Sequence, residues 1–569
     1  MTAAIQRSDE LFGHPKGLYV CFFTEMWERF SFYGMKALLL LYLLKHHGFT
    51  ETDAYVVVGA YGGMVYAVPL IGGMLADRYL GMRKAVVLGG ILLSLGHLGM
   101  AVEGHQAATI NGVVHRDVFA LGVFYLSLAL IISGVGFLKP NISTIVGKLY
   151  PKNDPRLDSG FTVFYAGINV GALFSSLICG YLGEVWGWGW GFGAAGVGMV
   201  AGLLMFISGQ KYLHGHAEPK YPERLRRRVL GPLNVEWCIY LGAVLGLPAI
   251  WLMMQLGYAV LYLQFAFLIG WLGWFAWYIS THCNKVQREQ MLAVVFFIAA
   301  SLFFFAMYEQ TYGSWLLFTD RMLTKDFFPS LVITDGKPWP WSIIPLAIAP
   351  AIAGIALRLD NARLARLLMA GIGIAGFVIF LRDAIVLPQT AESLEYLPSW
   401  VLIVLTPLFA WLWPFLERRR MNPSKPIKNA IGLAFTGFSF LVLSMANATV
   451  TEGHLAPVWW LLGAYVVLEI GELFLSPIGL AAVTQLSVPA TVGVMMGAYW
   501  LTTSLSEQAA AMFSSFAALD IPEGGKIDLA IAKIKYGTLF DHMLWLGLGS
   551  AVIALLLSPL IKRWMHGVK

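Results

Sequence analysis

The chain carries little charge for its length. Only 13% of its 569 residues are Asp, Glu, Lys or Arg, whereas 58% are hydrophobic. Soluble globular proteins carry about a quarter charged residues, so a water-soluble fold would not hide this much apolar surface. The apolar residues occur in runs of roughly 20 or more, long enough as helices to cross a hydrocarbon core of about 30 Å. The alternating segments of a membrane β-barrel are missing. We therefore expect an all-α integral membrane protein.

Cysteine is also scarce, with four residues in the whole chain. The cysteines lie far apart, in or beside apolar spans, and show no CxxC spacing, which argues against a disulfide framework or a metal site. We interpret them as packing residues. The polar start of the chain, residues 1–16, lacks the pattern of a signal peptide, so the first apolar span is expected to stay in the mature protein. The four cysteines are Cys21, Cys179, Cys238 and Cys283.

The net charge of +6 arises from Lys and Arg in alternate loops. Such residues accumulate in the cytoplasmic loops of membrane proteins, which explains the excess better than nucleic-acid binding does. The alternation places the basic loops and both termini in the cytoplasm. We expect the membrane to be the plasma (bacterial inner) membrane. The basic loops contain Arg78, Arg83 and Lys84; Lys148, Lys152 and Arg156; Arg226, Arg227 and Arg228; Lys285 and Arg288; and Arg418, Arg419, Arg420, Lys425 and Lys428.

Apolar runs and polar breaks predict about sixteen spans. We expect an N-terminal six-helix bundle over 1–210, a cytoplasmic linker with an inserted helix pair over 211–289, and a C-terminal bundle over 290–569. A second inserted pair is predicted near 337–388. Two bundles with substrate bound between them are a common transporter plan. The spans are 18–45, 53–77, 83–103, 117–147, 158–183, 187–208, 233–256, 257–281, 290–320, 337–358, 364–388, 398–417, 428–447, 457–482, 491–517 and 540–562.

Ionisable residues inside spans are costly and indicate function by default. In the first span, Glu25, Glu28 and Arg29 have spacings of three and four residues and therefore share a helical face. Lys36 lies two turns further along that face. A structural ion-pair patch between helices is the alternative. The density of charge favours function.

Other spans contain further ionisable residues. Lys139 lies in the fourth span beside Pro140, where the helix loses a hydrogen bond. In the second half, Glu309 lies within a span, and Glu472 and Ser476 are four residues apart on one face. A buried carboxylate whose cation partner leaves and returns is suited to bind and release a proton. Ion pairs of this kind between the two halves would open and close a central cavity.

Aromatic and histidine residues near these charges allow two interpretations. Pocket lining and core packing are equally compatible with each aromatic residue. His97, in the third span, is interpreted as a core histidine with satisfied hydrogen bonds. The aromatic residues near the charged faces are Tyr33, Tyr66, Tyr165, Tyr499 and Trp500.

Several motifs together resemble the proton-dependent oligopeptide transporter family of the major facilitator superfamily. A loop motif between the second and third spans is similar to one shared by many facilitators. Three further elements are more specific and occur in the family's order. They are Glu25-x-x-Glu28-Arg29 in the first span, Phe164-Tyr165-x-x-Ile168-Asn169-x-Gly171 in the fifth, and Gly471-Glu472-Leu473-x-Leu475-Ser476-Pro477 near the end.

The resemblance implies two six-helix bundles with inserted pairs, about 14–16 transmembrane helices, and import of di- and tripeptides with protons by alternating access. It implies no enzyme activity, metal, nucleic acid or cofactor, with protons as the coupling ion, peptides as substrates and membrane lipid around the chain. The proton-coupling residues would be Glu25, Glu28, Arg29, Lys139 and Glu309, with Glu309 pairing with Lys36 when the outer gate closes. The substrate-binding residues would be Tyr33, Lys36, Tyr66, Lys139, Tyr165, Asn169, Glu472, Ser476 and Trp500. The conformational loop would use Asp77, Arg78 and Arg83.

The sequence departs from the family pattern in ways that bear on substrate. Lys36 stands where arginine is usual, which keeps the charge but loses a bidentate clamp on a carboxylate. Phe32 stands where tyrosine is common. The alternative function is therefore a major facilitator for another small solute, such as nitrate, a drug or a modified peptide. A membrane-embedded enzyme would need an HExxH, GxSxG or paired-Asp constellation, and the sequence contains none.

Overall fold

A computed structural model describes residues 10–151, 154, 156–359, 361–519 and 527–568. Among these residues, thirteen helical stretches are long and apolar enough to cross a membrane. Three of the predicted spans fall outside that set. Helices α2 (Lys16–Lys45) and α19 (Val492–Ser515) contain charged and polar residues in their middle, and α14 (Ile343–Arg358) has only 16 residues. The prediction of an all-α membrane protein is confirmed, and the sixteen predicted spans comprise these thirteen stretches together with α2, α14 and α19.

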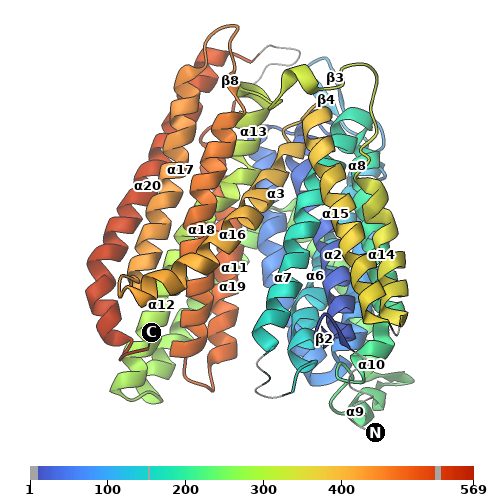
Figure 1. The fold of residues 1–569 in the computed structure, drawn as a ribbon, viewed down its shortest axis with the longest axis vertical. Coiled ribbons are helices and arrows are strands. Elements are labelled where there is room, and N and C mark those ends of the chain that lie inside the picture. Colours follow the sequence, from blue (N-terminus) through green and yellow to red (C-terminus); the bar gives the residue numbers. More distant parts are fainter. Residues whose placement is uncertain (1–9, 152–153, 155, 360, 520–526, 569) are drawn as a thin grey trace. The chain divides into compact units, whose positions relative to one another are not determined.

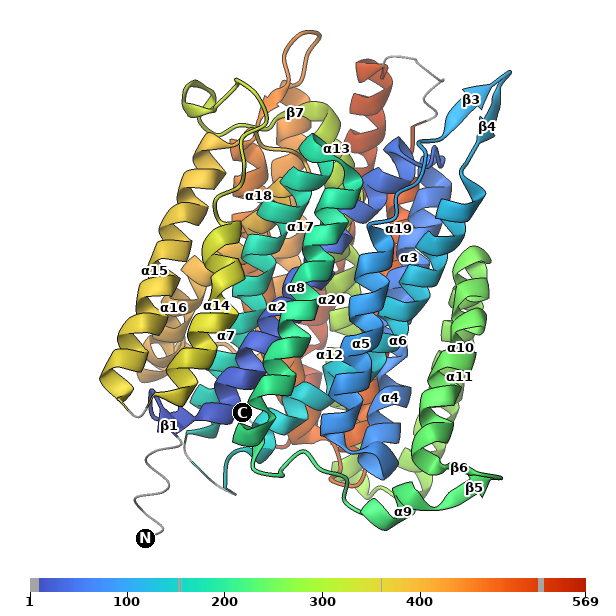
Figure 2. The same ribbon diagram turned by 90° about the vertical axis from the view of Figure 1, so that its right-hand side faces the viewer.

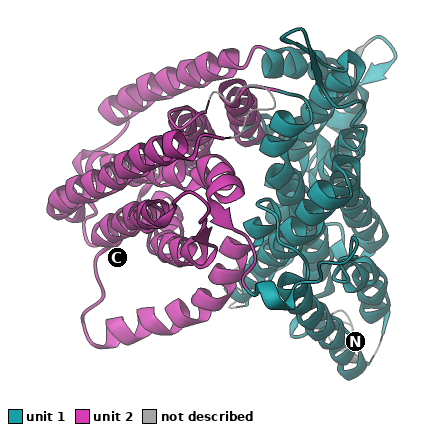
Figure 3. Cartoon of the chain, turned by 90° about the horizontal axis from the view of Figure 1, so that it is seen from above, with its two compact units in different colours: residues 1–48, 68–255, 328–396 teal, residues 49–67, 256–327, 397–569 magenta. Residues whose placement is uncertain are grey.

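The chain divides into two compact units that interleave along the sequence (Figure 3). Unit 1 comprises residues 1–48, 68–255 and 328–396, and unit 2 comprises residues 49–67, 256–327 and 397–569. The three segments 1–210, 211–289 and 290–569 describe chain order and stay a prediction. The span Glu51–Leu80 contributes to both units, because its first part is in unit 2 and its second part in unit 1.

Unit 1 holds most of the first half of the chain and the second inserted helix pair (Figures 1 and 2). Its helices α14 and α15 lie side by side. Short hairpins β3–β4 and β5–β6 lie at opposite ends of the unit (Figure 2). Besides α2 and α14, the elements are β1 (Glu10–Leu11), β2 (His14–Pro15), α4 (Pro69–Leu75), η1 (Ala76–Leu80), α5 (Met82–Met100), β3 (Ala108–Ile110), β4 (Val113–His115), α6 (Val118–Lys148), α7 (Leu157–Ser175), η2 (Ser176–Gly180), η3 (Leu182–Trp186), α8 (Trp188–Gly209), η4 (Gln210–Leu213), α9 (Pro222–Arg226), β5 (Arg228–Leu230), β6 (Leu233–Asn234), α10 (Val235–Gln255), η6 (Pro329–Leu331), α15 (Ala362–Val386) and η7 (Ser393–Tyr396).

Unit 2 consists of long helices with one short parallel strand pair, β7–β8. Helices α17 and α20 run side by side (Figure 1). The predicted span 290–320 is interrupted by a short 3-10 turn, and the last helix begins 11 residues before the predicted span. Besides α19, the elements are α3 (Glu51–Ala67), α11 (Tyr258–Thr281), α12 (Lys285–Tyr308), η5 (Glu309–Tyr312), α13 (Ser314–Met322), β7 (Leu323–Thr324), α16 (Leu397–Arg418), α17 (Lys425–Thr449), β8 (Ala456–Pro457), α18 (Trp459–Leu486) and α20 (Leu529–Trp564).

Glycine contacts place the middle of α6 against α4 in unit 1. Pro140 lies inside α6 and has no N–H to donate to the carbonyl of Gly136 one turn earlier. A Cβ added to Gly72 of α4 would lie 2.1 Å from that carbonyl oxygen, so only glycine permits this approach. The Asn141 amide donates to the Phe137 carbonyl at 2.7 Å, across the position of Pro140. This close packing holds the segment that carries Lys139.

A buried ion pair holds the ends of three helices together in unit 2. Arg321 of α13 donates to Glu51 of α3 at 2.6 Å and to the Tyr536 hydroxyl of α20 at 3.1 Å. The second Glu51 oxygen accepts the backbone N–H of Leu519 at 3.0 Å. The two charged side chains are 7% and 5% exposed. Both oxygens of Glu51 therefore have donors in a site with little solvent.

Arg321→Leu is expected to destabilise the protein by about 3–5 kcal/mol, because it leaves the Glu51 charge buried without its cation. The measurement is the melting temperature of the detergent-solubilised protein. Lys45→Met is the control, because Lys45 and Glu184 form an ion pair at 2.9 Å whose side chains are 34% and 31% exposed, and such pairs contribute about 0–1 kcal/mol. Equal melting temperatures for the two variants would contradict the prediction.

Candidate functional site

The charged face of α2 forms a closed cluster in unit 1. Arg29 donates through Nη2 to Glu28 Oε1 at 2.6 Å and through Nε to the other Glu28 oxygen. Its Nε also lies 3.4 Å from Glu25 Oε1. All three side chains are buried, with 2%, 1% and 3% of Arg29, Glu28 and Glu25 exposed. The sequence prediction that these residues share a face is confirmed by these contacts.

Two lysines belong to the same electrostatic group. Lys139 of α6 interacts with Glu25, Glu28, Arg29 and Lys36. Lys36 is itself buried on α2, with 4% of its surface exposed. Two carboxylates and three cations leave the group with a net positive charge when all are ionised. An anion placed beside this group would therefore be electrostatically favoured.

His97 of α5 differs from its prediction in one respect. It is buried as expected, with 1% of its surface exposed, and it interacts electrostatically with Arg29. Neither ring nitrogen has a hydrogen-bond partner among the described residues, so the expectation of a satisfied core histidine is wrong. The backbone of His97 lies close to Gly196 of α8, where glycine lets the helices approach. Close helix packing explains its burial without a polar partner.

The aromatic and amide residues predicted around this cluster occupy different environments. The Arg29 guanidinium lies 5.9 Å from the ring centroid of Tyr33 and 4.8 Å from that of Phe32. Tyr165 is 51% exposed, so it is not a core residue of unit 1. The Asn169 amide donates to the Tyr165 carbonyl at 3.1 Å within α7.

The predicted conformational loop contacts the segment that follows α8. Arg83 pairs with Glu218 through Nε at 2.5 Å and donates to Gln210 at 3.1 Å. Asp77 and Arg78 are exposed in η1. Gly81 has a φ of +78°, and a Cβ there would lie 2.5 Å from the nitrogen of Pro219. The loop is thus held to the linker, a contact that the sequence did not indicate.

Carboxylates gather in unit 2 around Tyr308. The Tyr308 hydroxyl donates to Glu469 Oε1 at 3.2 Å. Glu472 lies beside Glu469 and Tyr308, and it interacts electrostatically with Glu309. Glu469 is fully buried. The structure therefore brings the predicted Glu309 and Glu472 together, with Glu469 beside them.

Three more predicted residues lie on the helices of unit 2. Ser476 is one turn beyond Glu472 on α18, and its buried Oγ has no hydrogen-bond partner among the described residues. The rings of Tyr66 and Trp500 are nearly parallel, at an angle of 5°, with centroids 6.5 Å apart. Tyr66 lies in α3 and Trp500 lies in α19. The two rings form one aromatic surface. From the sequence, Tyr66 and Trp500 were predicted as two separate residues.

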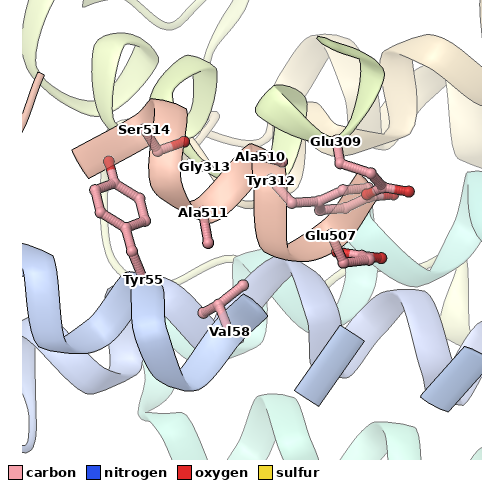
Figure 4. A pocket seen from close by; sticks show the side chains of 9 residues that line it. All are labelled: Tyr55, Val58, Glu309, Tyr312, Gly313, Glu507, Ala510, Ala511 and Ser514. Carbon is pink, nitrogen blue, oxygen red and sulfur yellow. The ribbon is translucent and has the colours of Figure 1, made fainter. Parts of the chain in front are cut away.

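A small cavity in unit 2 is lined by the carboxylate of Glu507, a residue that the sequence analysis did not identify. Its volume is about 10 Å³, room for about one water molecule. Glu309 and Glu507 extend to the same side of it (Figure 4). A Cβ on Gly62 of α3 would lie 2.5 Å from the Glu507 carboxylate, so glycine leaves the space this group fills. Glu507 lies inside the predicted span 491–517 and is 4% exposed. The criterion used for the other charges, an ionisable residue inside an apolar span, also identifies Glu507 from the sequence.

The predicted site residues form separate groups in the two units. Unit 1 holds the cluster around Arg29, the loop at Arg83, and the residues of α7. Unit 2 holds the carboxylates and the aromatic pair. The predicted pair between Lys36 and Glu309 joins residues of different units and stays a prediction.

Known proteins resemble this chain along nearly its whole length. The family model described as "POT family" matches residues 83–333 and 387–524. An uncharacterized transporter, YclF of Bacillus subtilis, is 32% identical over 98% of this chain and 96% of its own length. A di-/tripeptide transporter of Lactococcus lactis is 28% identical, covering 87% of this chain and 88% of its own length. A crystal structure of a peptide transporter POT with sulfate is 28% identical, with a TM-score of 0.72 over 98% of this chain and 97% of that one.

Proposed function

This chain belongs to the POT family, and on that premise we propose that it imports di- and tripeptides together with protons by alternating access. The names of its relatives support peptide substrates, since they include a di-/tripeptide transporter and peptide transporters of known structure. The proton is the coupling ion, and the mechanism requires no cofactor.

The distribution of charge carries the proposal. A peptide is a zwitterion, and in a low-dielectric cavity each of its ends needs an opposite charge. Unit 1 supplies the buried cations Lys36 and Arg29 and the half-buried Lys139, and unit 2 supplies carboxylates at Glu309, Glu469 and Glu472. In our proposal the peptide carboxylate faces Lys36 and Lys139, and its amine faces Glu472. Asn169 and Ser476 complete the amine site.

The contacts of Arg29 support the proposed proton coupling. Its guanidinium is engaged by Glu28 at 2.6 Å, while Glu25 lies at the longer distance of 3.4 Å. One Glu25 oxygen is buried without a hydrogen-bond partner among the described residues. Glu25 is therefore the more weakly held carboxylate and, in our proposal, the one that takes up a proton. A peptide carboxylate near Lys139 would compete with Glu25 for the cation and favour that protonation.

The location proposed for the protein is the plasma membrane of a bacterium, with both termini in the cytoplasm. The support is the distribution of Lys and Arg over alternate loops. In that orientation the loop at Arg83 and the linker at Glu218 face the cytoplasm. An inward proton gradient would then drive import.

The test is uptake of labelled dialanine into proteoliposomes, with and without an imposed inward proton gradient. Accumulation only with the gradient is expected. A folded protein that takes up no peptide under either condition would overturn the substrate class and favour another small solute. Uptake that is equal under both conditions would overturn proton coupling but leave peptide transport in place.

A further inference from the structure

Helix α11, the second helix of the first inserted pair, is mostly exposed but holds one buried amide. Only 17% of the residues in the most apolar stretch of α11 are buried. The side chains of Tyr262 and Phe265 are 73% and 47% exposed. Gln264, between them in sequence, is 2% exposed. A polar side chain on a lipid-facing helix is costly without a partner. This residue must therefore gain its stability from the helices it contacts.

The amide of Gln264 joins three helices at one point within unit 2. Its Nε2 donates to the Ser504 hydroxyl at 2.8 Å and to the Ser504 carbonyl at 3.2 Å. The Ser504 hydroxyl in turn donates to the Gly63 carbonyl at 2.6 Å. A Cβ on Gly63 would lie 2.3 Å from Gln264 Nε2, so only glycine leaves room for the amide. Helices α3, α11 and α19 are thus linked by a continuous set of hydrogen bonds.

We call the hydrogen-bonded contact of Gln264, Ser504 and Gly63 the joint. The joint is one helical turn from the aromatic pair. Trp500 precedes Ser504 by four residues on α19, and Tyr66 follows Gly63 by three residues on α3. Residues with these spacings lie on the same side of a helix. The Tyr66 and Trp500 rings remain nearly parallel at a centroid distance of 6.5 Å. The separation of α3 and α19 at the joint therefore sets the separation of the two rings.

We propose that Gln264 is a positioning residue through which the inserted helix α11 fixes the Tyr66–Trp500 surface and thereby the selection of peptide side chains. The inference rests on the proposed function, since it gives the aromatic pair a peptide to contact. Hydrogen bonds between helices in a membrane lack competition from water, and small residues at the contact permit the close approach they need. The inserted pair thus has a role in selectivity while lying outside the charged sites.

The first test compares Gln264→Leu with the original protein in proteoliposomes, measuring KM and kcat for alanyl-phenylalanine and for dialanine. The KM for alanyl-phenylalanine is expected to rise about three- to tenfold, the effect of one interhelical hydrogen bond, because its ring needs the aromatic surface. The kcat and the KM for dialanine should change less than about twofold. Gly63→Ala should reproduce this result by displacing the amide. Gly270→Ala, on the same helix with open space around its added Cβ, is the control and should change nothing.

Two results would overturn the inference. Unchanged KM values for both peptides in Gln264→Leu would show that the joint does not reach the substrate. An equal fall of kcat for both peptides would show that Gln264 only maintains the folded state.

A second measurement does not depend on the transported solute. Cysteines placed at Tyr66 and Trp500, in a protein whose four natural cysteines are replaced, report the separation of α3 and α19 by their cross-linking rate. Gln264→Leu is expected to lower that rate at least about threefold. An unchanged rate would refute the positioning role. A lower rate in a protein that takes up no peptide would uphold the positioning role and refute the proposed function instead.

Discussion

Glu25→Gln is expected to abolish accumulation of dialanine against its concentration gradient. A driving force of about 100 mV supplies about 2.3 kcal/mol per proton, enough for about 50-fold accumulation at one proton per peptide. Glutamine is a neutral isostere of the protonated carboxyl group and cannot release a proton, so the accumulation ratio should fall to about one. The measurement is gradient-driven uptake into proteoliposomes. Lys139→Ala should have the same effect, because Lys139 interacts with the same carboxylates.

Exchange of peptide across the membrane without a gradient is the control for Glu25→Gln. This exchange requires binding and the conformational change but no net proton movement, and the neutral variant should retain it. Loss of exchange together with accumulation would mean that Glu25 holds the α2 cluster in place. Full accumulation in either variant would refute the assignment of the cluster around Arg29 to proton coupling.

Glu472→Gln is expected to raise the KM for dialanine about ten- to a hundredfold. A hydrogen bond to a charged group contributes about 1.5–3 kcal/mol, and the variant removes the charge that the peptide amine would meet. Peptides with a blocked amino terminus carry no such charge, so their uptake should change little. The measurement is the KM for dialanine and for its amino-terminally acetylated form.

The comparison of the two peptides also separates binding from folding. Glu472 lies beside Glu469 and Tyr308, so a variant that disturbed this group would weaken every substrate. An equal loss for the free and the acetylated peptide would show that Glu472 does not bind the amine. Ser476→Ala, one turn away, should show a smaller preference of the same sign if its hydroxyl assists Glu472.

Features confined to one helix were predictable from the sequence. The contact between Glu25 and Arg29 follows from their spacing of four residues, which places both side chains on one face, and Glu28 is the neighbour of Arg29 in the chain. Lys139 was identifiable because charge within an apolar span is rare and functional. Glu507 satisfies the same criterion and was overlooked. In these cases helical geometry and the cost of burying charge are sufficient, and no knowledge of neighbouring helices is required.

Features that join distant segments required the structure. Arg83 meets Glu218, 135 residues later, and Gln264 meets Ser504, 240 residues later. The hydrogen bonding of His97 also required the structure, because the sequence around it does not show whether a donor or acceptor reaches its ring. Helical periodicity assigns a face to each residue but leaves open which helix packs against that face.

The sequence alone determined that this protein is an all-α membrane protein, which side chains carry charge into the membrane, and which family the motifs resemble. Hydropathy and helical spacing are local properties, so they can be read along the chain. The tertiary structure decided which charges meet, that Tyr66 and Trp500 face one another, and that the Gln264 amide of the inserted helix α11 is hydrogen-bonded between α3 and α19. These contacts depend on glycines such as Gly63 and Gly72, whose missing side chains set how closely two helices approach. That dependence appears only when both helices are seen together.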